Sequence, residues 1–499
     1  MTAYDQLFAI MSRTADIASA AAVLGWDQET YMPDGAVAAR AEQLATLSTL
    51  IHQFMTSDET KRAVERAKSD VATDDVRKQR IVSTFERDVI RSSKLPDDLV
   101  HEAAHTAALA QDAWKRARMS SDFRIFQPLL EKTVELKLRQ AEYLGPAEHP
   151  YDNLLDEYEP GLTVGELTPV FERLRKGTVD LLNDIQPTAH EVNDDVLHRF
   201  YAPDRQLAVA TDIISKLGFS LETGRVDLSA HPFCTSFAST DVRLTTRIRE
   251  HDLRSCLFGL IHEAGHGMYE QGIGADLART SSGQGASMGI HESQSLFWEN
   301  IIARSEEFWQ WAFPRLRDAF PDALSDQTPR EFYRSINRIV RSLNRVESDE
   351  VTYNLHIILR FEIERDLLAG TLKVADIPAV WNEKMSTSLG VVPPNDAEGC
   401  LQDVHWSFGG IGYFPSYTLG KLYAAMQWQA LSAEMPDVRE RIANGDFQPI
   451  REWMRTNIHD VGRTELPSEI IQRVCGRPLT EIDFLDYVRA KAGRVYGFA

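Results

Sequence analysis

The residues best suited to chemistry in this sequence are the two histidines and the glutamate of His262-Glu263-x-x-His266. On an α-helix, a spacing of four residues places both imidazoles on one face, where they can share one metal ion. Glu263 lies about 100° from His262 around the helix axis, so its carboxylate can take a proton from a metal-bound water. This pattern predicts a zinc hydrolase. Chance occurrence and a pair of surface histidines are the alternatives.

A hydrolytic zinc site needs three protein ligands and one open position for water. The motif with a third histidine, H-E-x-x-H-x-x-G-x-x-H, is excluded because Tyr269 and Gly272 replace its glycine and its last histidine. Glu270 lies too far along the helix axis to meet the same ion as His262. The third ligand must therefore come from outside this helix.

The next predicted helix offers Glu292, 30 residues after His262, and the glycine-rich segment 272–289 is long enough to turn the chain. We therefore select Glu292 as the third ligand. His291 and Glu299 are the alternatives, and Glu292 could also be a helix N-terminal glutamate that is stabilised only by the helix dipole.

Composition restricts the class of protein. The chain has 499 residues, of which 43% are hydrophobic and 26% charged, as in soluble globular proteins, and it can form a large core without disulfides. Its net charge of −20 argues against nucleic acid or an anionic membrane as the main partner. The four cysteines lack C-x-x-C spacing, and no run approaches the ~18 apolar residues of a membrane span. We expect a cytoplasmic protein.

Helical periodicity dominates the sequence outside the metal motif. Residues 24–27 are expected to form a helix-to-loop corner, 144–165 a polar connection, and 389–420 a loop-like segment. The expected helices lie near residues 5–23, 37–56, 74–94, 98–119, 123–143, 166–184, 197–217, 290–311, 329–343, 349–369 and 375–387.

A short β-hairpin is expected directly before the metal-motif helix. Residues 233–239 and 242–248 are rich in Phe, Thr, Val and Ser and are separated by a break. The hairpin should border the site, and a peptide can pair its backbone with such an edge. The expected fold is mostly α, with one continuous helical body over residues 1–499, two lobes around a groove, and residues 1–145 as a candidate outer lobe.

Six short motifs follow one another along the chain. Five are His231-Pro232-Phe233, Asp241-Val242-Arg243-Leu244-Thr245, His262-Glu263-Ala264-Gly265-His266, His291-Glu292-Ser293 and Gly399-Cys400-Leu401-Gln402-Asp403-Val404-His405-Trp406. They match H-P-F, D-x-R-x-T, H-E-x-x-H, H-E-S and G-x-x-Q-D-x-H-W at every fixed position. The remaining motif, I-R-x-x-A-D, retains Arg345 and Asp349 but has Asn344 and Ser348 at the Ile and Ala positions. In this order the motifs resemble the Taq-type thermostable metallocarboxypeptidase family, from about residue 20 to the C-terminus.

The resemblance implies a site with one Zn²⁺ per chain, bound by His262, His266 and Glu292, with Glu263 as general base. Co²⁺ and Mn²⁺ are alternative metals. It also implies a single metallocarboxypeptidase domain that releases C-terminal residues from peptides. The implied fold is a saddle-shaped, neurolysin-like helical body with a deep groove, assembled as a homodimer.

A carboxypeptidase must bind a terminal carboxylate, which a net-acidic protein repels unless cations lie nearby. Arg345 is the first candidate because a guanidinium binds a carboxylate bidentately. Arg243 is the second, although Asp241 could engage it structurally. Four further residues could donate hydrogen bonds to the oxyanion or to the substrate backbone, or could make structural hydrogen bonds instead: His231, His405, Tyr413 and Tyr417.

Two other functions fit parts of the sequence. A zinc oligopeptidase or endopeptidase on a similar helical groove would cut internal bonds and would need no arginine for the terminal carboxylate. A non-catalytic peptide-binding protein would not need Glu263 beside the first histidine. Asp349 and Asp403 are candidates for orienting a histidine or an arginine.

Overall fold

The computed structural model describes residues 2–185 and 192–498, which divide into two compact units. The first unit comprises Met1–Ser93, Asp194–Ile336 and Gln427–Arg477, and the second comprises Lys94–Asn193, Asn337–Met426 and Pro478–Ala499. The structure is 70% helical, and the residues it describes form one small sheet, which confirms the expected mostly-α class. The candidate outer lobe, residues 1–145, contributes to both units.

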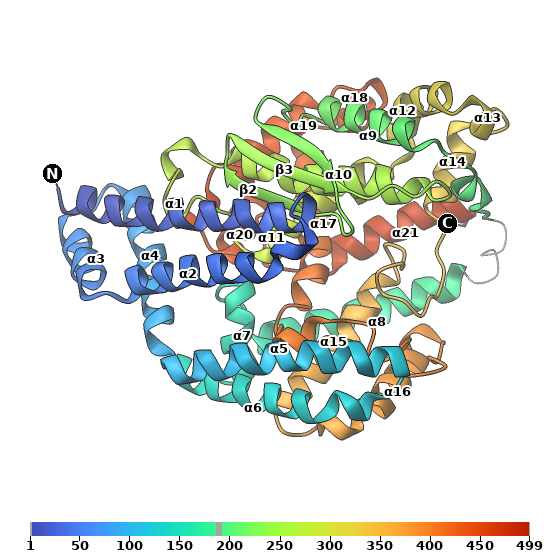
Figure 1. Ribbon diagram of the computed structural model, residues 1–499. Helices are drawn as coiled ribbons and strands as arrows, with labels where there is room; N and C mark the ends of the chain where they lie inside the picture. Colours follow the sequence, from blue (N-terminus) through green and yellow to red (C-terminus); the bar gives the residue numbers. More distant parts are fainter. Residues whose placement is uncertain (1, 186–191, 499) are drawn as a thin grey trace. The chain divides into compact units, whose positions relative to one another are not determined.

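The first unit contains the N-terminal helices, the sheet, and the helices that follow the sheet (Figure 1). Its helices are α1 (Ala3–Thr30), α2 (Val37–Thr56), α3 (Asp58–Asp70), α4 (Val76–Lys94), α9 (Pro203–Leu217), α10 (Leu253–Gly272), α11 (Met288–Leu296), the π-helix η6 (Phe297–Ile302), α12 (Glu306–Ala319), α13 (Pro321–Leu324), α14 (Pro329–Ile336), α18 (Val438–Asn444), α19 (Gln448–Met454) and α20 (Pro467–Cys475).

Three strands form the sheet, in the order β1-β3-β2: β1 (Gly224–Leu228), β2 (Cys234–Ala238) and β3 (Asp241–Thr246). β3 pairs with β1 in parallel and with β2 antiparallel. The antiparallel pair confirms the expected hairpin. Strand β1 is not among the elements predicted from the sequence. Its five residues alternate between polar and apolar, but the run is short, and in the structure Asp227 is buried whereas Leu228 is exposed.

Helix α10 carries the metal motif and contacts β2, β3, α9 and α11 (Figure 1). It begins where the Asp252 side chain accepts a hydrogen bond from the Arg254 backbone, which satisfies one of the open donors of the first turn. Most of its side chains are buried, including Leu260 and Ile261 directly before the motif. The surrounding elements therefore fix the rotation of α10 about its own axis.

The second unit consists of helices joined by loops. They are α5 (Asp97–Ser120), α6 (Gln127–Leu144), α7 (Pro150–Tyr158), α8 (Val164–Ile185), α15 (Tyr353–Leu368), α16 (Ile377–Leu389), the start of α17 (Pro415–Glu434) and α21 (Ile482–Tyr496). Helix α15 contacts α6, α7, α8 and α16 and is buried on nearly every side, with Phe361 between Tyr151 and Phe171.

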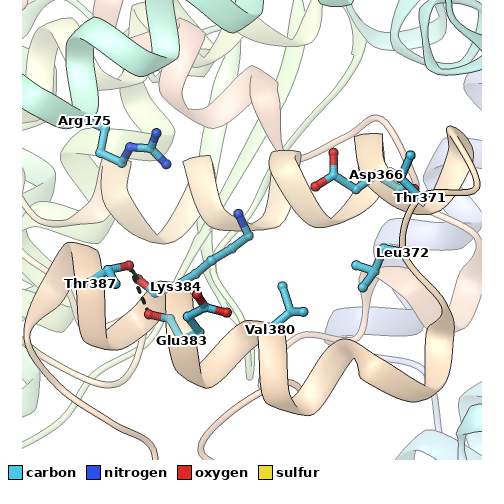
Figure 2. A pocket seen from close by; sticks show the side chains of 8 residues that line it. All are labelled: Arg175, Asp366, Thr371, Leu372, Val380, Glu383, Lys384 and Thr387. Carbon is cyan, nitrogen blue, oxygen red and sulfur yellow. Dashed lines mark hydrogen bonds between the residues drawn. The ribbon is translucent and has the colours of Figure 1, made fainter.

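A hollow of about 370 Å³ lies beside α15 and α16 in the second unit (Figure 2). Its two basic residues, Arg175 and Lys384, both bind the Glu362 carboxylate, at 2.5 and 2.6 Å. Both cationic groups in this hollow therefore already have a carboxylate partner within the protein. The lining residues are Arg175, Asp366, Thr371, Leu372, Val380, Glu383, Lys384 and Thr387.

The structure differs from the sequence-based expectation at two places in the first third of the chain. Helix α1 does not end at the expected corner 24–27 but continues to Thr30, shortly before Pro33. The expected polar connection 144–165 contains α7, which begins at Pro150. Proline is favourable at the first position of a helix, so it marks a helix start here rather than a break.

Helix α1 is long and apolar enough to cross a membrane by length and composition, with a mean hydropathy of 1.4 over its most apolar window. In the structure it contacts α2, α3 and β2, and the Ser19 hydroxyl donates a hydrogen bond to the Phe237 carbonyl at 2.9 Å. The length and apolarity of α1 differ from the sequence-based expectation that no segment approaches a membrane span. A buried core helix of a soluble protein and a signal sequence pass the same test, and 17% of the apolar window of α1 is buried.

Candidate functional site

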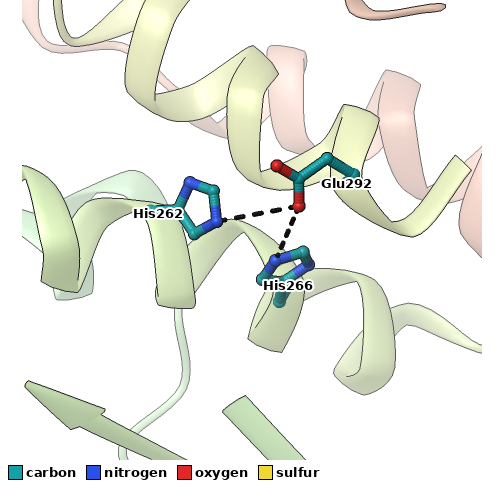
Figure 3. A group of neighbouring side chains, drawn as sticks. All are labelled: His262, His266 and Glu292. Carbon is teal, nitrogen blue, oxygen red and sulfur yellow. Dashed lines mark ion pairs between the residues drawn. The ribbon is translucent and has the colours of Figure 1, made fainter. Parts of the chain in front are cut away.

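Three side chains of the first unit converge as the spacing predicts (Figure 3). Glu292 Oε2 lies 3.8 Å from His262 Nε2 and 3.5 Å from His266 Nε2. One ligand atom from each residue lies within 4.8 Å of the others. The structure therefore brings together the two histidines of α10 and the selected glutamate of α11, each directing one atom at a shared point.

Close contact between α10 and α11 makes this convergence possible. A Cβ atom on Gly265 would lie 2.5 Å from Ser295 Cα and 2.6 Å from the Gln294 carbonyl oxygen. On the other side of α10, a Cβ on Gly267 would lie 2.7 Å from the Phe219 ring. The two glycines are about 200° apart around the helix. Helix α10 is therefore packed closely against α11 on one face and against the Phe219 ring on the opposite face.

The outward nitrogen of His262 is held by a carboxylate. Its Nδ1 lies 2.9 Å from Glu299 Oε2, and Arg304 donates to the other oxygen of Glu299 at 2.9 Å. Glu299 lies on the π-helix η6, which directly continues α11. Single π-helical turns occur frequently at functional sites. Glu299, an alternative third ligand, thus contacts the side of His262 opposite to Glu292.

The outward nitrogen of His266 is held by a second histidine. His266 Nδ1 lies 2.6 Å from His291 Nδ1, and His291 Nε2 lies 2.8 Å from Glu270 Oε1. If His266 Nδ1 donates, His291 Nδ1 must accept, and the proton on His291 Nε2 is then donated to Glu270. This arrangement leaves the Nε2 lone pair of His266 directed at Glu292. His291, the other alternative ligand, therefore has both nitrogens engaged.

The charges around the three side chains favour a cation. Burial would lower the pKa of His262, but Glu292, Glu299 and Glu263 raise that pKa to about 10. Burial and the neighbouring Glu292 raise the pKa of Glu263 to about 7, although His262 acts in the opposite direction. Several carboxylates thus compete for the few positive charges present. A divalent cation between the two imidazoles would relieve this repulsion.

The donor set fits a catalytic zinc ion. Two imidazole nitrogens and one carboxylate oxygen are the ligands of a common class of zinc hydrolase site, with a fourth position left for water. Both imidazoles are oriented through their other nitrogen, a usual feature of histidines that bind metals. Glu263 directly follows His262 on α10, and its side chain is only 8% exposed.

In the second unit, Arg345 lies in a buried network with Asp403 and Arg360. Arg345 binds Asp403 Oδ1 at 2.7 Å, and Arg360 binds Asp403 Oδ2 at 2.6 Å. Arg345 also donates to the Tyr353 hydroxyl at 2.6 Å. Although burial opposes it, the two arginines hold the pKa of Asp403 well below its usual range. Two guanidinium groups share one carboxylate, so these three side chains carry a net positive charge.

Three other predicted substrate contacts lie beside this network. Arg345 is 5.2 Å from the Tyr417 ring centre, and the Tyr417 hydroxyl is 3.3 Å from His405 Nε2. The rings of His405 and Tyr413 are 5.4 Å apart. Burial, with both arginines nearby, lowers the pKa of His405 to about 4, so its imidazole is neutral near pH 7. The structure thus brings together four of the six predicted substrate contacts.

The other two predicted contacts, His231 and Arg243, belong to the first unit. His231 is exposed in the segment between β1 and β2. Arg243 binds Asp241 through two nitrogens, at 3.0 and 3.1 Å, and lies over the rings of Trp26 and Phe237. Asp241 therefore binds Arg243, as anticipated from the sequence.

The two aspartates considered as orienting residues differ. Asp403 does orient Arg345, whereas Asp349 accepts hydrogen bonds from the Thr352 hydroxyl and from backbone groups at Val340 and Val351. Sequence reasoning missed Arg360, which lies 43 residues before its partner. An arginine within the otherwise apolar run 357–361 is the signal that could have identified it.

Residues 6–492 match the family of carboxypeptidase Taq (M32) metallopeptidases. The chain belongs to this family. Carboxypeptidase 1 of Bacillus subtilis is 37% identical over 493 residues, covering 98% of each chain. Thermostable carboxypeptidase 1 of Thermus thermophilus is 39% identical over 506 residues, covering 99% of each. The crystal structure of an M32 carboxypeptidase from Deinococcus radiodurans R1 matches with a TM-score of 0.97 at 38% identity, covering 99% of both chains.

The comparisons confirm the resemblance seen in the motifs. The protein is a metallocarboxypeptidase and thus a peptide hydrolase. An M32 metallopeptidase requires a divalent metal, and the His262–His266–Glu292 cluster is a group in the described residues that could hold one.

The close contact at Gly265 predicts a specific loss of metal affinity. Gly265→Ala would push α11 away from α10, and overpacking of this kind costs ~1–3 kcal/mol. We expect metal affinity, measured by competition with a chelator, to fall about tenfold or more.

Gly259→Ala on the same helix is the matched control, since its Cβ would have no neighbour closer than 3.9 Å. Both changes raise helix propensity equally, so only the clash differs between them. Equal metal affinity in the two variants would show that the α10–α11 distance does not control the site.

Proposed function

We propose that this metallocarboxypeptidase uses Zn²⁺ held by His262, His266 and Glu292 to release single C-terminal residues from peptides. The observation that carries the proposal is the meeting of two imidazole nitrogens and one carboxylate oxygen within 4.8 Å. A glutamate follows the first histidine on the same helix. Bound zinc lowers the pKa of a coordinated water to about 7 and polarises the scissile carbonyl. Co²⁺ and Mn²⁺ accept similar ligands and are the alternative metals.

Glu263 acts as the general base in this proposal. Its carboxylate accepts a proton from the attacking water and returns it to the leaving amine. A base is most effective when its pKa lies near the working pH, and burial raises the pKa of Glu263 to about 7. The contacts of Glu299 with His262, and of His291 with His266, orient both imidazoles so that their Nε2 atoms remain available.

Arg345 binds the terminal carboxylate of the peptide in this proposal. Arg345 and Arg360 share the single carboxylate of Asp403, so the network keeps one surplus positive charge, and Arg345 is its more exposed arginine. A fixed, buried guanidinium binds a carboxylate more strongly than a mobile surface side chain, because less entropy is lost on binding. His405, Tyr413 and Tyr417 supply hydrogen bonds to the oxyanion or to the peptide backbone. His231 and Arg243 are secondary candidates for substrate contact.

Loss of the base should separate metal binding from catalysis. Glu263→Gln preserves the shape of the side chain but cannot accept the proton, so kcat should fall ~10²–10⁴-fold. Metal content, measured by elemental analysis of the purified protein, should stay at that of the wild type. Peptide hydrolysis at the wild-type rate would show that Glu263 is not the base.

Recognition of the terminal carboxylate can be tested with one peptide in two forms. Amidation of its C-terminus removes the charge, and truncating a buried charge contact costs about 2 kcal/mol or more, so kcat/KM should fall ~30-fold. Arg345→Met should raise KM for the free acid by a similar factor and should discriminate little between the two forms.

Arg341→Met is the matched control, because Arg341 comes from the same segment and binds Asn183 at 2.9 Å instead. It should behave like the wild type. Equal cleavage of acid and amide by the wild type would favour an endopeptidase instead.

We also propose that the protein works in the cytoplasm as a homodimer. The dimer follows from the family resemblance. The four cysteines, Cys234, Cys256, Cys400 and Cys475, are all free, as in a reducing compartment. Sedimentation at assay concentrations should give twice the mass of one chain, and cell fractionation should place the protein in the soluble cytoplasmic fraction.

A further inference from the structure

Helix α15 is buried on nearly every side, yet it carries several polar side chains. Asn354, Arg360 and Glu364 are each 0% exposed, and Glu362 is 6% exposed. Buried polar groups of this kind are stable only when they have partners. Three of the four find partners in the segment 402–418, and Glu362 instead binds Arg175 and Lys384.

Glu364 makes the largest set of contacts with this segment. Its Oε1 accepts a hydrogen bond from Trp406 Nε1 at 2.8 Å. Its Oε2 accepts from the Tyr151 hydroxyl of α7 at 2.5 Å and from the Gly412 backbone amide at 3.0 Å. A single buried carboxylate therefore joins two helices to two points of one loop.

The two points are next to the residues proposed to contact substrate. Trp406 directly follows His405, and Gly412 directly precedes Tyr413. Between them the chain forms only the short 3₁₀ turn η8 (His405–Phe408) and a glycine-rich turn. Gly412 has φ of +98°, and a Cβ there would lie 2.9 Å from the Leu154 carbonyl oxygen, so this turn lies directly against α7.

We propose that Glu364 is a positioning residue for peptide binding, which holds the 405–413 loop so that His405 and Tyr413 are presented to the substrate. The proposal rests on the function proposed above, in which these two side chains contact the peptide. Glu364 itself does not touch the substrate. It acts through the Trp406 indole and the Gly412 amide.

The proposal requires a carboxylate rather than an amide at this position. Both oxygens of Glu364 accept hydrogen bonds, and all three partners are donors. A glutamine would replace one oxygen with an NH₂ group, which would face either the indole N–H or the Gly412 N–H. Burial raises the pKa of Glu364, and the three donors oppose this shift because they stabilise the charged form.

The test compares Glu364→Gln with Glu362→Gln on the same helix. Glu362 is nearly as buried, but its partners Arg175 and Lys384 line the hollow of Figure 2 and not the loop. Two quantities are measured in each variant: hydrogen exchange of the peptide containing the Gly412 amide, and kcat and KM for a free-acid peptide.

We expect Glu364→Gln to speed exchange in this peptide and to lower kcat/KM by ~10- to 100-fold, mainly through KM, because a small misplacement of contact residues has effects of this size. Glu362→Gln should leave both quantities near those of the wild type. Unchanged exchange in Glu364→Gln, or faster exchange with unchanged kcat/KM, overturns the positioning role while the wild type remains active. A wild type that cleaves no free-acid peptide overturns the proposed function, and this proposal with it.

If Glu364→Gln does not fold, Tyr151→Phe supplies the second variant. It removes one of the two donors to Oε2 and preserves the ring that contacts Phe361. The change in exchange and in KM should have the same direction and a smaller size. No change in either quantity overturns the proposal.

Discussion

The close packing of α10 against α11 is the constraint on which the metal cluster depends. Gly265, between the two motif histidines, allows Glu292 to reach both Nε2 atoms, because any larger residue would meet the backbone of α11. Gly267 allows an equally close approach of Phe219 on the other side. Because these neighbours prevent α10 from shifting or rotating, the positions of the metal ligands are determined by the packing around α10 as well as by the motif.

The buried charge near the candidate functional residues has opposite sign in the two units. In the first unit, carboxylates outnumber cations around the histidine pair, which favours a metal ion. In the second, Arg345 and Arg360 share Asp403, which favours an anion. A chain with a net charge of −20 thus contains a local basic network. The surplus of negative charge in the first unit suits a metal ion, and the surplus of positive charge in the second suits a carboxylate. Peptide hydrolysis at a C-terminus needs a Lewis acid and a group that binds the terminal carboxylate.

The predictable parts of the site are those encoded by local spacing. The four-residue interval between His262 and His266 predicts the histidine pair, and the glycine-rich segment allows Glu292 to reach it. The segments before α10 that are rich in Phe, Thr, Val and Ser predict β2 and β3. Hydrogen-bond and ion-pair partners that are far apart in the sequence cannot be predicted from local spacing. Arg360 and Glu364 lie one turn apart on the same face of α15, but 43 and 42 residues from Asp403 and Trp406, so local spacing does not identify their partners. Strand β1 buries Asp227 and exposes Leu228, the reverse of what the alternation of its residues predicts.

The buried polar residues of α15 are not explained by stability alone. Replacing a buried ion pair or polar group by well-packed apolar residues is often neutral or stabilising, so the burial of Arg360 and Glu364 needs another reason. Their partners supply one. Asp403, Trp406 and Gly412 belong to a segment that has no strand and only one short 3₁₀ turn between residues 402 and 414, so regular backbone hydrogen bonding cannot hold it in place. Such a segment keeps one conformation when neighbouring elements hold it. Here α5 and α6 contact η8, and α15 adds buried hydrogen bonds and ion pairs to Asp403, Trp406 and Gly412.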